Sequence, residues 1–158
     1  MQTNIKPYLP LKQSEKKGLI EGYASFFDVI DQQRDQIAKG AFKKTLRAWR
    51  LLGKTPKILW QHDPKQPIGV WTHLSEDEQG LYVKGRLTLG VSKADEAYLL
   101  LKEDVLESLS IGFRTIEAMQ DKDHKTRVLL DIDLVEISLV TFGANTRATI
   151  HNVKFSHQ

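Results

Sequence analysis

The chain has 158 residues, of which 41% are hydrophobic and 27% charged, with a net charge of +3 at neutral pH. This length suits one globular domain that buries about two-thirds of its unfolded surface, and the low charge gives no support for nucleic-acid binding. The absence of cysteine excludes a disulfide scaffold, a cysteine-ligated zinc site and a cysteine nucleophile, and it fits a reducing compartment. No apolar run approaches the ~20 residues of a membrane-spanning helix, so we expect neither nucleic acid nor a membrane as a partner.

The first segments run from a polar lead-in into an extended pattern. Residues 1–17 contain two prolines and predict a partly flexible lead-in, after which a single domain is expected over residues 18–158. Residues 18–27 are rich in aromatic and β-compatible side chains, which predicts a strand. The polar residues 28–35 predict a loop.

The remainder alternates helical and extended patterns. Apolar residues at spacings of three and four predict a helix over residues 37–49, which Gly53 ends. Ser92 and Asp95 resemble a capping box that opens a second helix over residues 92–101. Further strands are predicted over residues 55–62, 68–74, 81–89, 105–117, 127–142 and 149–155, the last as an edge strand. The fold class is therefore mainly β with a few helices, in a small, mostly antiparallel β-barrel or sandwich.

The first candidate for chemistry is His62, at the end of an apolar strand and before Asp63-Pro64. Proline cannot continue a strand ladder, so the histidine lies where the strand stops. Imidazole titrates near neutrality and suits a general base at the edge of a cleft. From these residues alone, a turn histidine bonded to the backbone is the simpler interpretation.

The second candidate is Ser110. Alternation places Leu109 and Ile111 on the core face of a strand and Ser108, Ser110 and Gly112 on the other. A glycine within a strand often marks the close approach of another chain segment, so a serine beside it could attack a bound peptide. Two solvent-facing serines on a strand are the alternative.

The third candidate is Glu136. It lies with Ser138 on one face of a strand whose other face carries Val135, Ile137 and Leu139. A carboxylate in an apolar strand is costly to bury unless it is paired, and an imidazole would both satisfy it and be oriented by it. An exposed glutamate on a half-solvated strand is equally compatible with the pattern.

Together His62, Ser110 and Glu136 supply a base, a nucleophile and an orienting group, the three roles of a hydrolytic triad. A metal-dependent hydrolase would instead use His62, Asp63 and His73, but neighbouring side chains of a strand point to opposite faces and no helical His pair exists. We expect no metal and no other cofactor. A nucleic-acid-binding barrel would stack bases on three aromatic residues, which are more typical of a core: Trp60, Trp71 and Tyr82.

Several segments, in order along residues 18–146, carry a family resemblance: EGYASFFDVID, RDQIAKGAF, LWQHDPKQPIG, SLSIGF and LVEISLVTFGAN. They resemble the prohead (capsid-maturation) proteases of tailed bacteriophages. The resemblance implies a serine endopeptidase with a β-barrel similar to the herpesvirus assemblins, in which His62 is the base, Ser110 the nucleophile and Glu136 the third member. The family often has glycine where Ser108 stands, so two serines compete here, and Ser110 is preferred because it abuts the Ile-Gly-Phe match.

The resemblance also implies partners and a place of action. The expected substrates are a scaffolding protein or the scaffold segment of the capsid protein, together with the protease itself. A homodimer or higher assembly is expected inside the assembling prohead, in the host bacterial cytoplasm. The alternative is a non-catalytic capsid-assembly or scaffold-associated structural protein that kept the fold.

Overall fold

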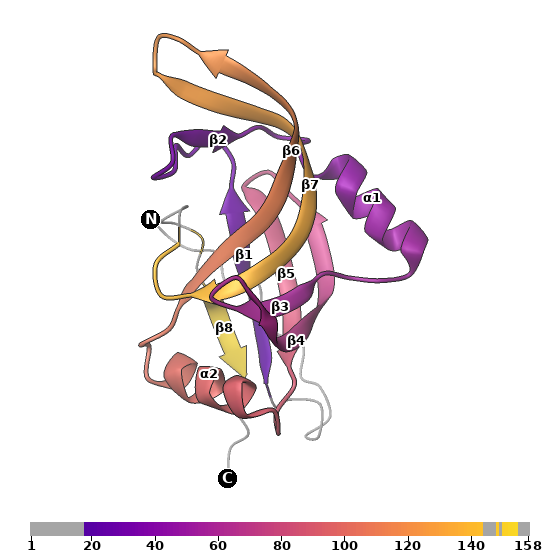
Figure 1. Ribbon diagram of the computed structural model, residues 1–158, viewed down its shortest axis with the longest axis vertical. Helices are drawn as coiled ribbons and strands as arrows, with labels where there is room; N and C mark the ends of the chain where they lie inside the picture. The colour runs from indigo at the N-terminus through magenta and orange to yellow at the C-terminus, as the bar shows by residue number, and fades with distance from the viewer. Residues whose placement is uncertain (1–17, 144–147, 149, 155–158) are drawn as a thin grey trace.

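The computed structural model describes residues 18–143, 148 and 150–154, and Figure 1 shows how their strands curl around one another. The predicted lead-in over residues 1–17 lies outside the described residues. The elements in chain order are β1 (Leu19–Phe26), β2 (Asp35–Ile37), α1 (Lys43–Leu52), β3 (Lys57–Trp60), β4 (Asp63–Glu76), β5 (Gly80–Leu87), α2 (Ser92–Lys102), β6 (Ser108–Asp121), β7 (Thr126–Val140) and β8 (Ile150–Lys154).

These strands form one sheet in the order β2-β7-β3-β4-β5-β1-β8, and β6 pairs with β7. All the pairs are antiparallel except β2 with β7 and β3 with β7. The sheet curls into a half-barrel, so that Leu109 N–H donates to Ala148 O at 2.8 Å and Ile150 N–H to Glu107 O at 2.7 Å. The predicted mainly β, mostly antiparallel barrel is confirmed, and β8 is the predicted edge strand.

The long β6–β7 hairpin crosses the half-barrel and carries much of the core (Figure 1). Strand alternation places Leu81, Val83 and Leu87 of β5 on one buried face, and Tyr82 on the opposite face is buried as well. The largest fully buried side chains come from five strands, β3 to β7, and from the turn before α1: Trp71, Phe42, Ile58, Ile68, Leu81, Leu87, Leu109, Leu129, Ile132, Leu134, Ile137 and Leu139. Among the described residues, no helix is long and apolar enough to cross a membrane.

The first helix is shorter than predicted. It begins at Lys43, because Ile37 belongs to β2 and pairs with Leu129 of β7, a contact with a distant segment that helical spacing cannot reveal. Gly40, with φ of 90°, then turns the chain into the helix. The predicted end is confirmed: Gly53 is left-handed, with φ of 65°, and its N–H donates to Arg50 O.

Two further predictions need correction. α2 has the predicted extent, but its N-cap is Val91, and the Asp95 carboxylate accepts the N–H of Gly90 at 2.8 Å instead of completing a capping box with Ser92. β6 begins at Ser108, so Val105, predicted to lie in this strand, is outside it and 63% exposed.

Candidate active site

His62 lies in the tight turn that joins β3 to β4. Trp60 pairs with Asp63, which leaves Gln61 and His62 as a two-residue hairpin turn. Both have positive φ, 51° and 60°, which is the conformation of a type I′ turn. A side chain in this region costs about 1–2 kcal/mol relative to glycine, so the fold maintains a strained backbone in order to present an imidazole here.

Hydrogen bonds to β7 and to Thr141, the residue after it, hold this turn in place. The Gln61 amide donates to Thr141 Oγ1 at 2.8 Å, and Thr141 N–H donates back to Gln61 Oε1 at 3.1 Å. The backbone N–H of His62 donates to Ser138 Oγ at 3.0 Å. Both residues of the strained turn, Gln61 and His62, are therefore tied to β7 or to the residue that follows it.

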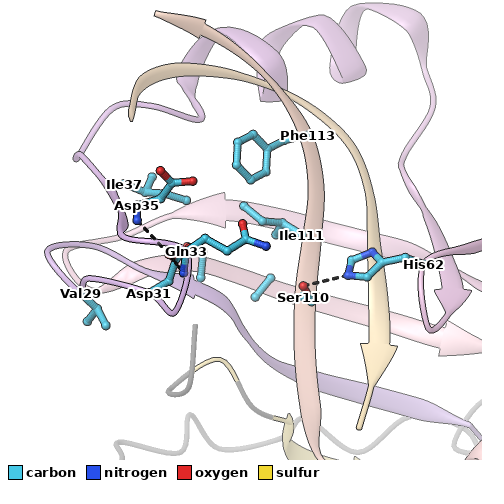
Figure 2. Close-up of a pocket in the computed structure, with 11 residues that line it drawn as sticks. Val29, Asp31, Gln33, Asp35, Ile37, His62, Ser110, Ile111 and Phe113 are labelled. Carbon is cyan, nitrogen blue, oxygen red and sulfur yellow. Dashed lines mark hydrogen bonds between the residues drawn. The ribbon is translucent and has the colours of Figure 1, made fainter. Parts of the chain in front are cut away.

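Ser110 meets the His62 ring from β6, directly opposite Ser138 of β7. Figure 2 shows the imidazole aimed at the serine, with 2.9 Å between His62 Nε2 and Ser110 Oγ. This distance lies in the range in which a base can take the proton of a hydroxyl. The His62 side chain is 41% exposed, so an approaching substrate can reach both groups.

Glu136 lies on the other side of the imidazole. Its Oε1 contacts His62 Nδ1, and its side chain is only 12% exposed. The contact favours the tautomer in which Nδ1 carries the proton and Nε2 is free to accept one from Ser110. The structure thus brings together the three residues that the sequence singled out.

Ser138 links two of these residues and was missed by the sequence analysis. Its hydroxyl donates to Glu136 Oε2 at 2.6 Å while accepting the His62 N–H, and the residue is fully buried. β7 is covered on both faces near Ser138, and the alternation of a strand with a period of two cannot reveal that a residue on its polar face is buried.

The prediction that Val135 lies on the buried face is wrong, since Val135 is 40% exposed.

The competing serine, Ser108, lies two residues earlier in β6 and pairs with Val140. It is half-buried, and the hydroxyl in contact with the His62 ring is that of Ser110.

The residues that a metal site or a nucleic-acid-binding surface would use have other partners. The Asp63 carboxylate accepts hydrogen bonds from Lys65 N–H and the Gln66 amide, and the His73 ring contacts the Ser75 hydroxyl. Within the described ranges no group of three or more candidate ligands surrounds a metal position. Of the three aromatic residues, Trp71 and Tyr82 are buried and Trp60 is half-buried, in agreement with a core role.

A small cavity of about 110 Å³ opens beside Ser110 and His62. It lies between β1, β6 and the segment that connects β1 to β2, which was predicted only as a polar loop. The other residues that line it are Ala24, Ser25, Val29, Asp31, Gln33, Asp35, Ile37, Ile111 and Phe113. The cavity adjoins the reactive groups, so it is positioned to receive part of a substrate.

The sequence as a whole identifies the class of protein. Residues 8–158 match the family described as the Caudovirus prohead serine protease, and the chain belongs to this family. It is 37% identical over 143 residues to the prohead protease of Enterobacteria phage HK97, covering 88% of this chain and 61% of that protein. It is 30% identical over 153 residues to the prohead protease of Escherichia phage T5, covering 96% of this chain and 71% of that protein. The chain therefore spans about three-fifths of the first relative and somewhat more of the second.

Solved structures share the fold at low sequence identity. The capsid assembly protease of bacteriophage T4 matches with a TM-score of 0.60 and 14% identity, over 77% of this chain and 81% of that one. The KSHV protease, in complex with a hexapeptide phosphonate inhibitor, matches with a TM-score of 0.52 and 14% identity, over 84% of this chain and 62% of that one. The predicted resemblance to herpesvirus proteases is confirmed at the level of the fold.

Proposed function

We propose that the chain is a serine endopeptidase that cleaves capsid or scaffold protein during prohead maturation. The observation that carries the proposal is the continuous contact from Ser110 Oγ to His62 Nε2, at 2.9 Å, and from His62 Nδ1 to Glu136. Membership of the prohead serine protease family supports the same class of reaction. No metal or other cofactor is required by this chemistry.

In the proposed reaction, Ser110 Oγ attacks the carbonyl carbon of the scissile peptide bond as His62 Nε2 takes its proton. Glu136 stabilises the imidazolium that forms and keeps Nε2 directed at the serine. His62 then returns the proton to the leaving amine, which frees the new N-terminus and leaves an acyl group on Ser110. A water molecule, deprotonated by the same imidazole, hydrolyses this ester.

The proposed substrates are the capsid protein or a scaffolding protein, together with the protease itself, and the proposed place is the interior of the assembling prohead in the host bacterium. One relative supports a link to the capsid protein. The chain is 34% identical over 103 residues to the capsid polyprotein of Pseudomonas phage PAJU2, a stretch that is 15% of that protein.

The test is co-expression of the chain with the capsid and scaffolding proteins of its own phage, followed by mass spectrometry of the products. The native chain should shorten its substrate, whereas Ser110→Ala should leave it intact while remaining folded. Ser108→Ala is the matched control, since it removes the same hydroxyl two residues away on the same strand, and it should still cleave. Unchanged processing by Ser110→Ala would instead favour the non-catalytic structural role.

A homodimer or higher assembly also belongs to this proposal. It rests on analogy with the assemblins rather than on a contact within the chain. Sedimentation equilibrium of the purified protein over a range of concentrations should give a mass above that of one chain, and a monomer at all concentrations would contradict it.

A further inference from the structure

The cavity beside Ser110 has a polar group at its wall that lacks a partner. Ser25 of β1 lines the cavity and is 1% exposed, and its hydroxyl has no hydrogen-bond partner among the described residues. Buried hydroxyls are nearly always satisfied, and an unsatisfied one is costly. A bound group that enters the cavity can supply the missing partner.

The charge of the cavity wall limits what that group can be. Asp31 and Asp35 both line the cavity, whereas its lining includes no lysine or arginine. Asp35 is neutralised from behind by Arg127, whose Nε and NH2 donate to its two oxygens at 2.9 and 3.0 Å. Two carboxylates against one guanidinium leave one net negative charge at this wall.

The charge that is not neutralised belongs to Asp31. Its Oδ1 already accepts the backbone N–H groups of Gln33 and Asp35, at 2.8 and 2.9 Å, which fixes the carboxylate at the edge of the cavity (Figure 2). An acidic ligand group would be repelled by it, and a hydrogen-bond donor would be attracted.

The cavity also has a suitable size and place for a single side chain. A cavity of about 150 Å³ is known to hold a benzene molecule, and this one has about 110 Å³. Val29, Ile37 and Ile111 line it as well and suit an aliphatic stem. The carbonyl carbon that Ser110 attacks is bonded directly to the Cα of the acyl-side residue, so that residue has the side chain nearest to the cavity.

We propose that this cavity binds the side chain of the residue on the acyl side of the cleaved bond, and that it selects a side chain with a hydrogen-bond-donating tip, an ammonium or a carboxamide, over a carboxylate or a methyl group. Ser25 and Asp31 are the residues that make the selection. This inference rests on the proposed serine-protease function and adds its substrate preference.

The experiment uses aminoalkyl phosphonate diphenyl esters, which combine with an active serine and carry one side chain next to the phosphorus. Four probes form two matched pairs: lysine against norleucine, which share an unbranched four-carbon stem, and glutamine against glutamate, which have nearly the same shape. Inactivation rates of the full chain should be about tenfold higher for lysine than for norleucine and for glutamine than for glutamate. Equal rates within either pair, or a preference for norleucine or glutamate, would overturn the inference.

Substitutions test the two selecting residues. Asp31→Asn keeps a side-chain oxygen for the backbone N–H groups but removes the charge, so the ratio of lysine to norleucine rates should fall severalfold. Asp28→Asn is the matched control, because Asp28 is an exposed carboxylate of the same loop that does not line the cavity. Ser25→Ala should reduce the ratio of glutamine to norleucine rates. If Asp28→Asn changes the lysine preference as much as Asp31→Asn does, the cavity is not its source.

A small fluorophosphonate without any side chain separates the two proposals. If it modifies Ser110 while the four probes show no preference, the substrate inference fails and the proposed function stands. If no probe modifies Ser110 in the folded protein, both fail.

Discussion

Gly112 of β6 lies directly opposite Glu136 of β7, and a β-carbon on Gly112 would lie 2.3 Å from Glu136 Oε1. Side chains do not approach so closely, so the carboxylate occupies space that only a glycine leaves open. The absence of a side chain at Gly112 is thus a requirement for the position of Glu136 against His62. This explains why a glycine stands in the middle of a strand, where it otherwise weakens packing.

Gly112→Ala should therefore displace the carboxylate and lower kcat/KM by about 10²-fold, the cost expected of a misplacement near 1 Å. In a Glu136→Ala background the same substitution should have little further effect, because the group it displaces is gone. A cycle of the four proteins measures this coupling. Independent effects of the two substitutions would contradict the steric explanation.

Glu136→Gln should lower kcat by about 10²–10⁴-fold with a smaller effect on KM, because the amide offers an N–H to His62 Nδ1 and favours the wrong tautomer. Steady-state kinetics on a peptide substrate checks this. Glu107→Gln is the matched control, since Glu107 is an exposed carboxyl just before the same strand pair, and its kcat should stay near that of the native chain. A loss of less than tenfold in Glu136→Gln would remove Glu136 from the triad.

Ser138→Ala should weaken both the turn and the carboxylate that this hydroxyl connects. It leaves the His62 N–H and Glu136 Oε2 without this partner, and the expected loss of stability is about 1–3 kcal/mol. If Ser138 positions the triad, kcat should fall about tenfold or more at temperatures where the variant is fully folded, with KM nearly unchanged. A lower melting temperature with native kcat would mean that its role is only structural.

High pH should destabilise the fold through two tyrosines. Burial, and then hydrogen bonds to Asp77 and Glu21, raise the pKa of Tyr23 and of Tyr82 above the ordinary value of 10.0. Between the unfolded and the folded pKa the unfolded chain binds fewer protons, so stability is complete below about pH 10 and falls as pH rises, by at most about 1.4 kcal/mol per pH unit for each tyrosine.

The Tyr23→Phe variant removes one of these titrating groups. Urea unfolding from about pH 8 to about pH 11 should show a shallower loss of stability than in the native chain. Lysines titrate in the same range but are identical in both proteins, so they cancel in the comparison. Equal slopes would show that Tyr23 does not contribute.

The parts of the fold that local patterns determine could be predicted from the sequence. A β-compatible composition identified β1, alternation identified β5 and β7, and Gly53 marked the end of α1, because these signals depend on neighbouring residues. β2 could not be predicted, since three residues become a strand only by pairing with β7, about ninety residues further along the chain. The apolar spacing around Ile37 was therefore assigned to the helix.

The site, too, has parts that local patterns predict and parts that depend on distant segments. A triad was suggested by the residue types and order of His62, Ser110 and Glu136, and the family motifs strengthened this prediction. The contacts among the three side chains depend on the register between β6 and β7, which no local pattern contains. Ser138 was missed because its burial depends on both faces of β7 being covered. The cavity was missed because Ser25 and Asp31 reach it from a part of the chain about eighty residues before Ser110.

The most direct test of the account is the identity of the residue that reacts with a fluorophosphonate. Mass-spectrometric mapping of the modified native chain should locate a single adduct on Ser110, and His62→Ala should slow its formation by about 10²–10⁴-fold. An adduct on Ser108 instead, or an unmodified Ser110 in a preparation that still cleaves its substrate, would contradict the assignment of Ser110 as the nucleophile.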